Sequence, residues 1–88
     1  MIFVYILQCS DGSYYTGYTT DIKRRLQEHN EGLGSKYTRG RRPVKCVYHE
    51  EMASKSDALK RELNIKKLNR SQKERLIQAN PGKHDYNT

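Results

Sequence analysis

Apolar side chains are concentrated in short runs along the first half of the chain. Residues 2–8 form a continuous β-favouring run with apolar positions on both alternating faces, which predicts a central strand covered on two sides. An Asp-Gly pair at residues 11–12 predicts a turn, so residues 14–18 are expected to return as a second strand. Residues 43–50 alternate in polarity and predict a third strand, with proline at its start, where no ladder hydrogen bond is lost.

A helix is predicted directly after the second strand. Ile22 and Leu26 lie one turn apart and would form its buried stripe, with Thr20 or Asp21 as the N-terminal cap. Residues 30–42 then combine several glycines with many lysines and arginines. This composition predicts a mobile basic loop that contacts a partner.

Two further helices are predicted in the last third of the chain. Ser54 or Ser56 is expected to start the first of them. Ser71 and Glu74 have the spacing of a capping box, which predicts a shorter helix through residues 76–77. The predicted apolar stripe of the first of these two helices consists of Ala58, Leu59, Leu63, Ile65 and Leu68.

The predicted elements follow one another in the order β-β-α-β-α-α. This order indicates an α+β fold, a small three-stranded antiparallel sheet flanked by helices. A length of 88 residues allows one domain with a thin core, expected to span residues 1–80. Residues 81–88 carry no pattern and are expected to form a disordered tail.

The charge of the chain indicates the kind of partner. Lys and Arg number 17 against 10 Asp and Glu, which gives a net charge of +7. Such an excess is typical of surfaces that bind polyanions, with nucleic acid first among them. The plain alternative is a small basic protein whose charge serves only solubility.

Cysteines and apolar runs indicate the compartment. Cys9 and Cys46 are the two cysteines, too few for a disulfide framework and not at zinc-ligand spacing, so both are expected to be buried. The apolar N-terminus is short and lacks a basic leader, so it is not expected to be a signal peptide. No apolar run has a length near the roughly 20 residues that a membrane-spanning helix needs. A cytoplasmic protein without membrane contact is therefore expected.

Groups suited to phosphodiester chemistry occur along the chain in a set order. Hydrolysis of a phosphodiester needs a proton acceptor, a cation beside the charged oxygens and usually a carboxylate for a metal. Two tyrosines, an arginine, a histidine and a glutamate could supply these groups. They are Tyr5, Tyr15, Arg25, His29 and Glu62.

The motifs around these groups resemble those of the GIY-YIG nuclease superfamily. Residues 3–5, Phe-Val-Tyr, and residues 15–17, Tyr-Thr-Gly, correspond to its two tyrosine signatures, and the resemblance covers residues 2–77. Within that superfamily the chain is similar to short stand-alone bacterial members. The family has a three-stranded antiparallel sheet with flanking helices, which agrees with the elements predicted above.

The resemblance implies a role for each of the five residues. Tyr5 and Tyr15 would enter the active site, and Arg25, ten residues after the second tyrosine, would be the catalytic arginine. His29 occupies the position of a helical His or Tyr one turn later, and Glu62, at the end of the pattern in residues 57–62, corresponds to the metal-binding glutamate.

Three departures from the family pattern lie in the two signatures or directly after them. Gly and Ile of the first are replaced by residues 3–4, Phe-Val, and Ile of the second by Thr16, at positions where packing sets the choice. A lysine carried by some members just after the second signature is Tyr18 here. If that lysine helps to polarise the site, Lys36 or Arg39 would take over this role here, or the activity would be lower.

Each candidate residue also has a structural interpretation. The two tyrosines could be half-buried sheet residues, and Arg25 could lie on a solvated helix face like Arg24. His29 alone would more often be a surface residue. Glu62 could pair with Lys66 at the i,i+4 spacing.

The register of the hairpin decides whether the two tyrosines can cooperate. A two-residue turn at residues 11–12 would pair Gln8 with Tyr15 and place Tyr5 and Tyr15 on opposite faces of the sheet. The expected chemistry requires a three-residue turn with a bulge instead, with Cys9 opposite Tyr15 and both tyrosines on one face.

The resemblance and the residues together predict a divalent-metal-dependent endonuclease. Mg²⁺, or Mn²⁺, would be held by Glu62, waters and a substrate oxygen, and a single carboxylate would bind it weakly without substrate. One of the two tyrosines would relay a proton, with Arg25 and His29 beside it. Four basic residues would hold the nucleic-acid backbone: Lys36, Arg39, Arg41 and Arg42.

The expected substrate is a nucleic acid, with DNA favoured over RNA. A core of this size carries no added reader of bases, which favours selection by DNA structure and a place in DNA repair or processing. A protein partner could supply further specificity. The alternative is a basic nucleic-acid-binding module of the same fold with weak or lapsed catalysis.

Overall fold

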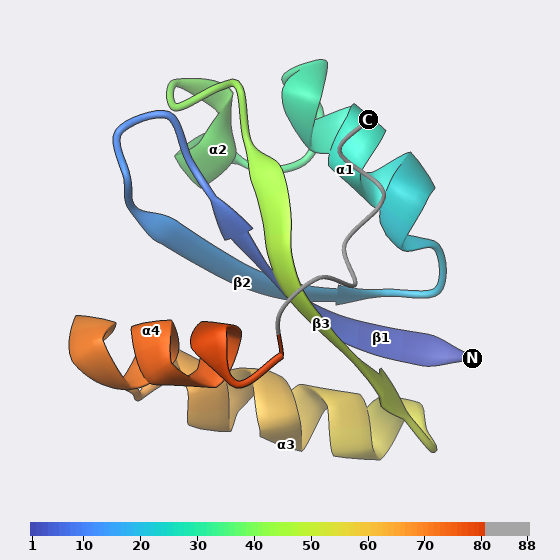
Figure 1. Ribbon diagram of the computed structural model, residues 1–88. Coiled ribbons are helices and arrows are strands. Elements are labelled where there is room, and N and C mark those ends of the chain that lie inside the picture. The colour runs from blue at the N-terminus through green and yellow to red at the C-terminus, as the bar shows by residue number, and fades with distance from the viewer. Residues whose placement is uncertain (81–88) are drawn as a thin grey trace.

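The computed structural model describes residues 1–80, which form a three-stranded antiparallel sheet with helices on both faces (Figure 1). Strand β1 lies between β2 and β3, so β2 is an edge strand. The predicted α+β class and order of elements are confirmed, with one short helix, α2, added between α1 and β3. The elements are β1 (Ile2–Gln8), β2 (Tyr14–Thr19), α1 (Ile22–Asn30), α2 (Lys36–Arg39), β3 (Lys45–Met52), α3 (Lys55–Lys66) and α4 (Arg70–Gln78).

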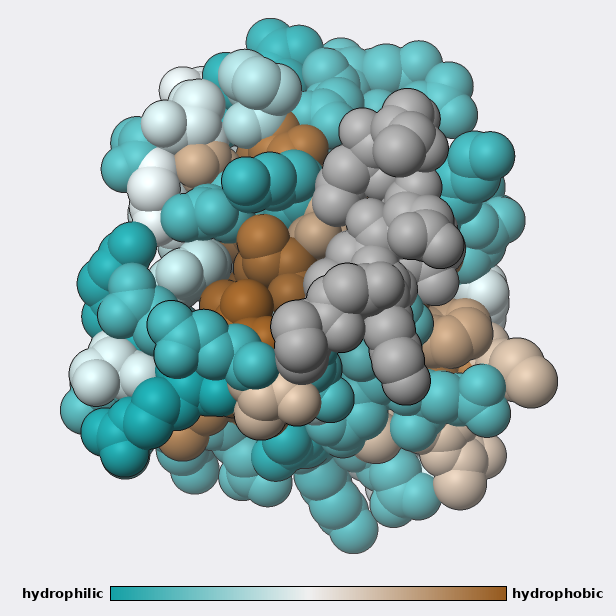
Figure 2. All heavy atoms as spheres, in the orientation of Figure 1, coloured by the Kyte–Doolittle hydropathy of each residue, from teal (hydrophilic) through white to brown (hydrophobic). Residues whose placement is uncertain are grey.

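The central strand separates two apolar cores. Tyr5 and Leu7 of β1 pack with Ile22 and Leu26 of α1 on one face. Alternate residues of β1 point to the other face, where they meet α3 and α4. The prediction that residues 2–8 are covered on two sides is therefore confirmed. Figure 2 shows a small apolar area in the middle of the face where β3 lies, with hydrophilic residues above it and to its left.

The hairpin between β1 and β2 has an odd loop, as predicted, but its register differs from the predicted one. Gly12 N donates to Cys9 O at 2.9 Å and Cys9 N donates to Ser13 O at 2.8 Å, which closes the loop at residue 13. Gly12 has φ 85°, the left-handed conformation that glycine adopts without a Cβ penalty.

The consequence of this loop is that Tyr15 lies opposite Leu7. The predicted pairing of Cys9 with Tyr15 is wrong by two residues, because the loop closes before Tyr14. A shift of two residues leaves every side chain on its predicted face, since strand side chains alternate with a period of two. Tyr5 and Tyr15 therefore lie on the same face, as expected.

Helix α3 packs on the sheet with a different stripe from the predicted one. Its buried residues are Ala58 and Ile65, whereas the side chains of Leu59 and Leu63 are 39% and 57% exposed. In this rotation Arg61 also reaches the sheet, where its Nε lies 3.0 Å from Glu50 Oε1 on β3. The apolar stripe predicted for this helix is thus partly wrong, and Ser54 is confirmed as its cap.

The N-terminal cap of helix α4 is Asn69, two residues before the predicted cap Ser71. The Asn69 side chain accepts a hydrogen bond from Gln72 N, and Asn69 N donates to Gln72 Oε1, each at 2.9 Å. The capping box is therefore Asn69–Gln72, and the predicted box of Ser71 and Glu74 is wrong because both already lie inside the helix.

The basic stretch at residues 30–42 is not the featureless loop expected from its composition. It contains α2, capped by Ser35, whose side chain accepts a hydrogen bond from Thr38 N. Thr38 is fully buried. This stretch therefore contributes to the interior of the molecule as well as to its surface.

Two expectations from the sequence concern membranes and the tail. Over residues 1–80 no helix is long and apolar enough to cross a membrane. The predicted disordered tail at residues 81–88 lies outside the described residues.

Candidate active site

A tyrosine and a histidine meet in the interior between β1 and α1. Tyr5 Oη lies 3.0 Å from His29 Nε2, and the two residues are 2% and 0% exposed. Asp21 caps α1 by accepting a hydrogen bond from Arg24 N, and Ile22 and Leu26 hold the helix against the sheet. The sequence interpretation of His29 as a surface residue is therefore excluded.

The other ring nitrogen of His29 is also hydrogen bonded. Nδ1 lies 2.8 Å from Thr38 Oγ1, which itself lies 3.0 Å from Ser35 Oγ and 3.4 Å from Ser35 O. A threonine hydroxyl donates one proton. When Thr38 donates to Ser35, His29 donates from Nδ1 and accepts the Tyr5 hydroxyl proton at Nε2. The chain Tyr5–His29–Thr38–Ser35 can thus orient a proton acceptor toward Tyr5.

Two glycines make room for these rings. A Cβ on Gly17, directly opposite Tyr5 on β2, would lie 2.6 Å from Tyr5 Oη. A Cβ on Gly34 would lie 2.1 Å from His29 Nδ1. Both distances are far inside van der Waals contact, so the site requires glycine at these two positions.

Arg25 is held beside the pair by its own contacts. Its Nη1 lies 3.1 Å from Glu28 Oε1, and its Nη2 donates to Gly34 O at 2.9 Å. Arg25 is half-buried whereas Arg24 is exposed. This separates the two arginines on physical grounds, which local sequence alone could not do.

Burial and nearby charge set the protonation of the pair. Burial raises the pKa of Tyr5 to about 12, against the lowering effect of hydrogen bonding and charge from Arg25; the charge of Glu62 raises this pKa further. Burial, and then the charge of Arg25, lowers the pKa of His29 to about 4. Both side chains are therefore neutral at neutral pH. Arg25 and Glu62 act on one hydroxyl although they belong to different helices.

Tyr15 forms the outer wall of this arrangement. Its ring centroid lies 5.1 Å from that of His29 in an edge-to-face contact. On its other side it stacks with Tyr37 at 6.0 Å. Tyr15 is half-buried and thus lies between the interior pair and the surface.

Glu62 approaches the site from α3, on the stripe between Ala58 and Ile65. Its side chain is 15% exposed, and Lys66 Nζ lies 3.8 Å from Oε2, so the alternative pairing with Lys66 is present but long. Within residues 1–80 no three His, Cys, Asp or Glu side chains cluster as a metal cage. A lone, little-exposed carboxylate suits a cation such as Mg²⁺ that keeps several waters and takes further ligands from a phosphate.

The four predicted nucleic-acid contacts fall into two classes. Lys36 and Arg39 are exposed on α2. Arg41 pairs with Asp11 at 3.1 Å and lies over the Tyr37 ring at 4.0 Å. Arg42 donates to backbone carbonyls of Arg39 and Asn30. The first two residues are available for a ligand, whereas the other two already support the fold.

Three residues of the site were not singled out from the sequence. Gly17 belongs to the second tyrosine motif, but its role in leaving space for the Tyr5 ring depends on the strand register, which pairs it with Tyr5. Gly34 and Thr38 lie in the stretch that was predicted to be a loop. That stretch contains the short helix α2, which buries Thr38 and which the sequence pattern did not indicate. The departure at Tyr18 lies on the opposite face, packed against the α3 side.

Comparison with known proteins places this geometry in a family. The model of the GIY-YIG catalytic domain matches residues 1–75. A UPF0213 protein of Halobacterium salinarum is 60% identical over 74 residues, 84% of this chain and 96% of the relative. A UPF0213 protein of Staphylococcus aureus is 57% identical over 75 residues, 85% and 92% of the two chains.

Solved structures agree with the sequence relatives. The solution structure of a UPF0213 protein from Bacillus halodurans has a TM-score of 0.62 and 46% identity, with 100% of this chain and 95% of that chain covered. A solution structure of an E. faecalis protein has a TM-score of 0.60 and 44% identity over 93% and 91%. With its matched motifs, converging side chains and similar relatives, the chain belongs to the GIY-YIG family of nucleases.

Proposed function

We propose that the protein is a divalent-metal-dependent endonuclease that hydrolyses phosphodiester bonds of nucleic acid. The observation that carries the proposal is the convergence on Tyr5: its hydroxyl is bonded to a neutral histidine and lies within the influence of Arg25 and Glu62. This combination offers a proton path and, within electrostatic range of the same hydroxyl, a cation and a carboxylate.

Tyr5 acts as the proton relay in this proposal. It takes a proton from the attacking water while it passes its own hydroxyl proton to His29 Nε2, 3.0 Å away. A tyrosine with a pKa of about 12 does not ionise alone at neutral pH, so the acceptor behind it is needed. Tyr5 is preferred to Tyr15 because its hydroxyl is the one bonded to His29.

Arg25 stabilises the negative charge that develops on the phosphate oxygens. Glu28 and the Gly34 carbonyl hold its guanidinium in place before the substrate arrives. A preorganised cation of this kind lowers the barrier because little reorganisation is needed during the reaction.

Glu62 is the residue that would hold Mg²⁺ or Mn²⁺, together with waters and a phosphate oxygen. When bound, the ion would polarise the phosphate and offset its charge. The carboxylate is otherwise paired with Lys66 alone at 3.8 Å among the described residues, which leaves it accessible to a cation. Weak metal binding without substrate is expected.

DNA is the proposed substrate class, with selection by DNA structure and a place in repair or processing. The net charge of +7 and the exposed Lys36 and Arg39 favour contacts with the backbone over contacts with bases. The rival function, a binding module of the same fold without catalysis, is favoured by the same charge.

Cleavage of a panel of single-stranded, duplex, nicked, flapped and branched DNA by wild type and Glu62→Gln separates the two functions. The nuclease proposal expects cutting with Mg²⁺ or Mn²⁺, none with chelator, and a loss of about 100-fold or more in Glu62→Gln with DNA binding retained. Glu51→Gln is the matched control, because Glu51 is exposed on β3. Binding without cutting in every condition would support the rival and overturn the proposal.

A further inference from the structure

A cleft opens at the free edge of the sheet, next to the candidate active site. It has a volume of about 240 Å³ and is lined by residues of β2, α2, α3 and α4. Tyr15 is a wall of both this cleft and the site, so the two adjoin. The residues of this tyrosine–lysine cleft are Tyr14, Tyr15, Thr16, Tyr37, Lys66 and Lys73.

Two lysines from different helices face this space. Lys66 comes from the end of α3 and Lys73 from α4. Lys66 has one long ion pair, to Glu62 at 3.8 Å, and Lys73 has no ion pair among residues 1–80. Two cations with little internal neutralisation attract an anion, and phosphate is the anion that a nuclease meets.

The walls of the cleft are aromatic, and ring stacking and cation–π contacts hold them in place. Tyr37 is held between Tyr15, which stacks on it, and Arg41, which lies over its ring. Tyr14 is held in a similar way by Arg70, whose guanidinium lies 4.8 Å from the ring centroid. Aromatic walls combined with basic side chains are typical of sites that take single-stranded nucleic acid.

The buried Thr16 hydroxyl adds an independent observation. Thr16 lines the cleft and is 4% exposed, yet its Oγ1 has no hydrogen-bond partner within the described part of the chain. Buried polar atoms are nearly always paired, so an orphan hydroxyl beside a cleft indicates that water or a ligand completes it.

The size of the cleft limits what it can hold. A volume of about 240 Å³ lies below the roughly 300 Å³ at which pockets for drug-sized ligands begin. One nucleotide unit of an extended strand suits this space. A paired duplex would offer its bases to each other and not to the tyrosine walls.

We propose that the tyrosine–lysine cleft binds the nucleotide adjoining the scissile phosphate in an unpaired strand. Its phosphate lies between Lys66 and Lys73, and its sugar and base lie against the tyrosine walls. This inference deepens the proposed function and rests on it: the nuclease would prefer substrates that present a single-stranded segment, such as flaps, to fully paired duplex.

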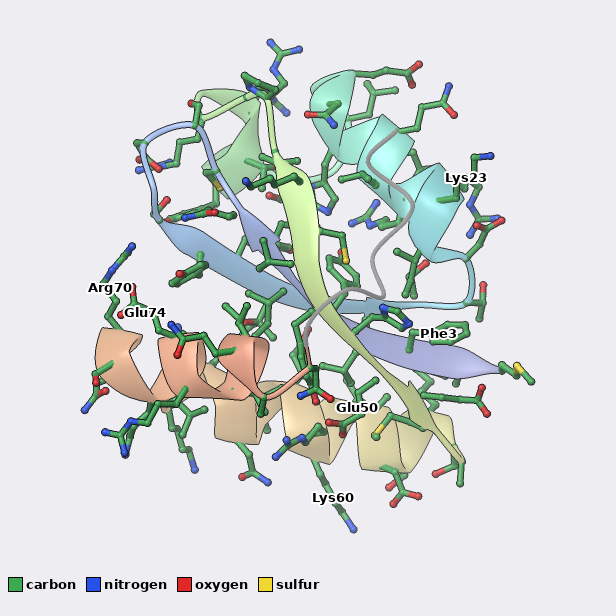
Figure 3. The ribbon with its side chains drawn as sticks, viewed as in Figure 1. Phe3, Lys23, Glu50, Lys60, Arg70 and Glu74 are labelled. Carbon is green, nitrogen blue, oxygen red and sulfur yellow. The ribbon has the colours of Figure 1, made fainter. Side chains whose placement is uncertain are left out.

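Binding without metal tests the cleft separately from catalysis. The measurement is fluorescence anisotropy of a labelled oligothymidylate and of a labelled duplex, in chelator, across a salt series. Lys66→Gln/Lys73→Gln is compared with Lys23→Gln/Lys60→Gln, which has the same net charge. Figure 3 shows Lys23 on α1 and Lys60 projecting from α3 away from the sheet.

The cleft variant is expected to lose about tenfold or more in affinity for the single strand, and its salt slope should fall by about 1. The control pair should lose less, and duplex affinity should change alike in both variants.

Equal losses of single-strand affinity in the two variants would show that only net charge matters and would overturn the proposed role of the cleft. If Lys66→Gln/Lys73→Gln cleaves flapped DNA as fast as wild type, the proposed role of the cleft is wrong and the proposed nuclease function is kept. Single-strand binding through the lysines without any cleavage would keep the cleft and reject the nuclease.

Discussion

The molecule contains two clusters of tyrosine, arginine and glutamate, and they differ in how their partners are arranged. In the first, on the α3 face, the Tyr48 hydroxyl donates to one oxygen of Glu50, and Arg61 Nε lies 3.0 Å from the other. In the second, Tyr5 is bonded to His29, while Arg25 pairs with Glu28 and Glu62 lies apart on α3.

The difference shows that residue types alone do not define a site. Burial raises the pKa of Tyr48 as it raises the pKa of Tyr5, so the direction of the shift does not separate the clusters. In the Tyr48 cluster the carboxylate joins both other groups, and its charge and hydrogen bonds are satisfied. In the Tyr5 cluster Arg25 pairs with Glu28 and Glu62 pairs with Lys66, so the carboxylate on α3 joins neither the tyrosine nor the arginine. The first cluster fastens α3 to β3, and the second is the candidate for chemistry.

Removal of one hydroxyl from each cluster should produce the largest contrast. Tyr5→Phe is expected to lower cleavage by about 10² to 10⁴, because the proton path to His29 is lost. Tyr48→Phe should leave cleavage near the wild-type rate and cost about 1 kcal/mol of unfolding free energy. Single-turnover cleavage and urea unfolding check both. Equal cleavage rates in the two variants would remove the functional distinction.

Crowding the histidine should be nearly as damaging. Gly34→Ala places a Cβ 2.1 Å from His29 Nδ1, and we expect a loss of about 3 kcal/mol of stability together with lost cleavage. Gly40→Ala is the control, since no atom lies within 4 Å of its added Cβ and its φ is −90°. Urea midpoints measure the difference. A Gly34→Ala protein as stable as Gly40→Ala would contradict the tight packing of His29.

Acid should weaken the Tyr5 cluster through His29. Its pKa is lowered to about 4 in the folded protein, below the ordinary value of about 6.5, so between these values the unfolded chain binds one more proton. The contribution of neutral His29 to the free energy of unfolding is therefore fully present above about pH 6.5. It decreases by about 2–3 kcal/mol as the pH falls toward 4. Unfolding measured against pH should show this slope, and His29→Gln should remove it. An unchanged slope in His29→Gln would assign the effect to other groups.

Loosening the histidine should have the smallest effect. Thr38→Val removes the partner of His29 Nδ1 at 2.8 Å, and cleavage should fall about fivefold to tenfold as the ring loses its fixed orientation. The acid limb of the pH–rate profile should move as well, which a purely structural role would not cause. Thr38→Ser keeps the hydroxyl and should restore both. Failure of that rescue would remove Thr38 as a positioning residue.

The strands and their faces could be predicted because they depend on local pattern. The apolar run at residues 2–8 and the turn at Asp11 predict the two strands, whereas the common face of Tyr5 and Tyr15 was predicted only because the expected chemistry requires it. The register itself was missed by two residues, because the left-handed Gly12 closes the loop at Ser13 and this depends on one backbone conformation.

The interior of the site could not be predicted because it depends on contacts distant in sequence. His29 contacts Gly34 and Thr38, and Thr38 lies on the short helix α2 within a stretch whose composition predicts a loop. Helix α3 is rotated so that Ala58 and Ile65 are buried and Arg61 pairs with Glu50, eleven residues away. Periodicity carries no information about such pairs, so it assigned Leu59 to the core.

The most direct test of the distinction between the clusters is a parallel measurement of cleavage and unfolding in Glu62→Gln and Glu50→Gln. Glu62→Gln should lose cleavage by about 100-fold or more. Its stability should stay within about 1 kcal/mol, because its ion pair with Lys66 is long and half-exposed. Glu50→Gln should keep cleavage and lose about 1–2 kcal/mol of unfolding free energy. The reverse pattern, with cleavage dependent on Glu50 and indifferent to Glu62, would contradict the assignment of the active site.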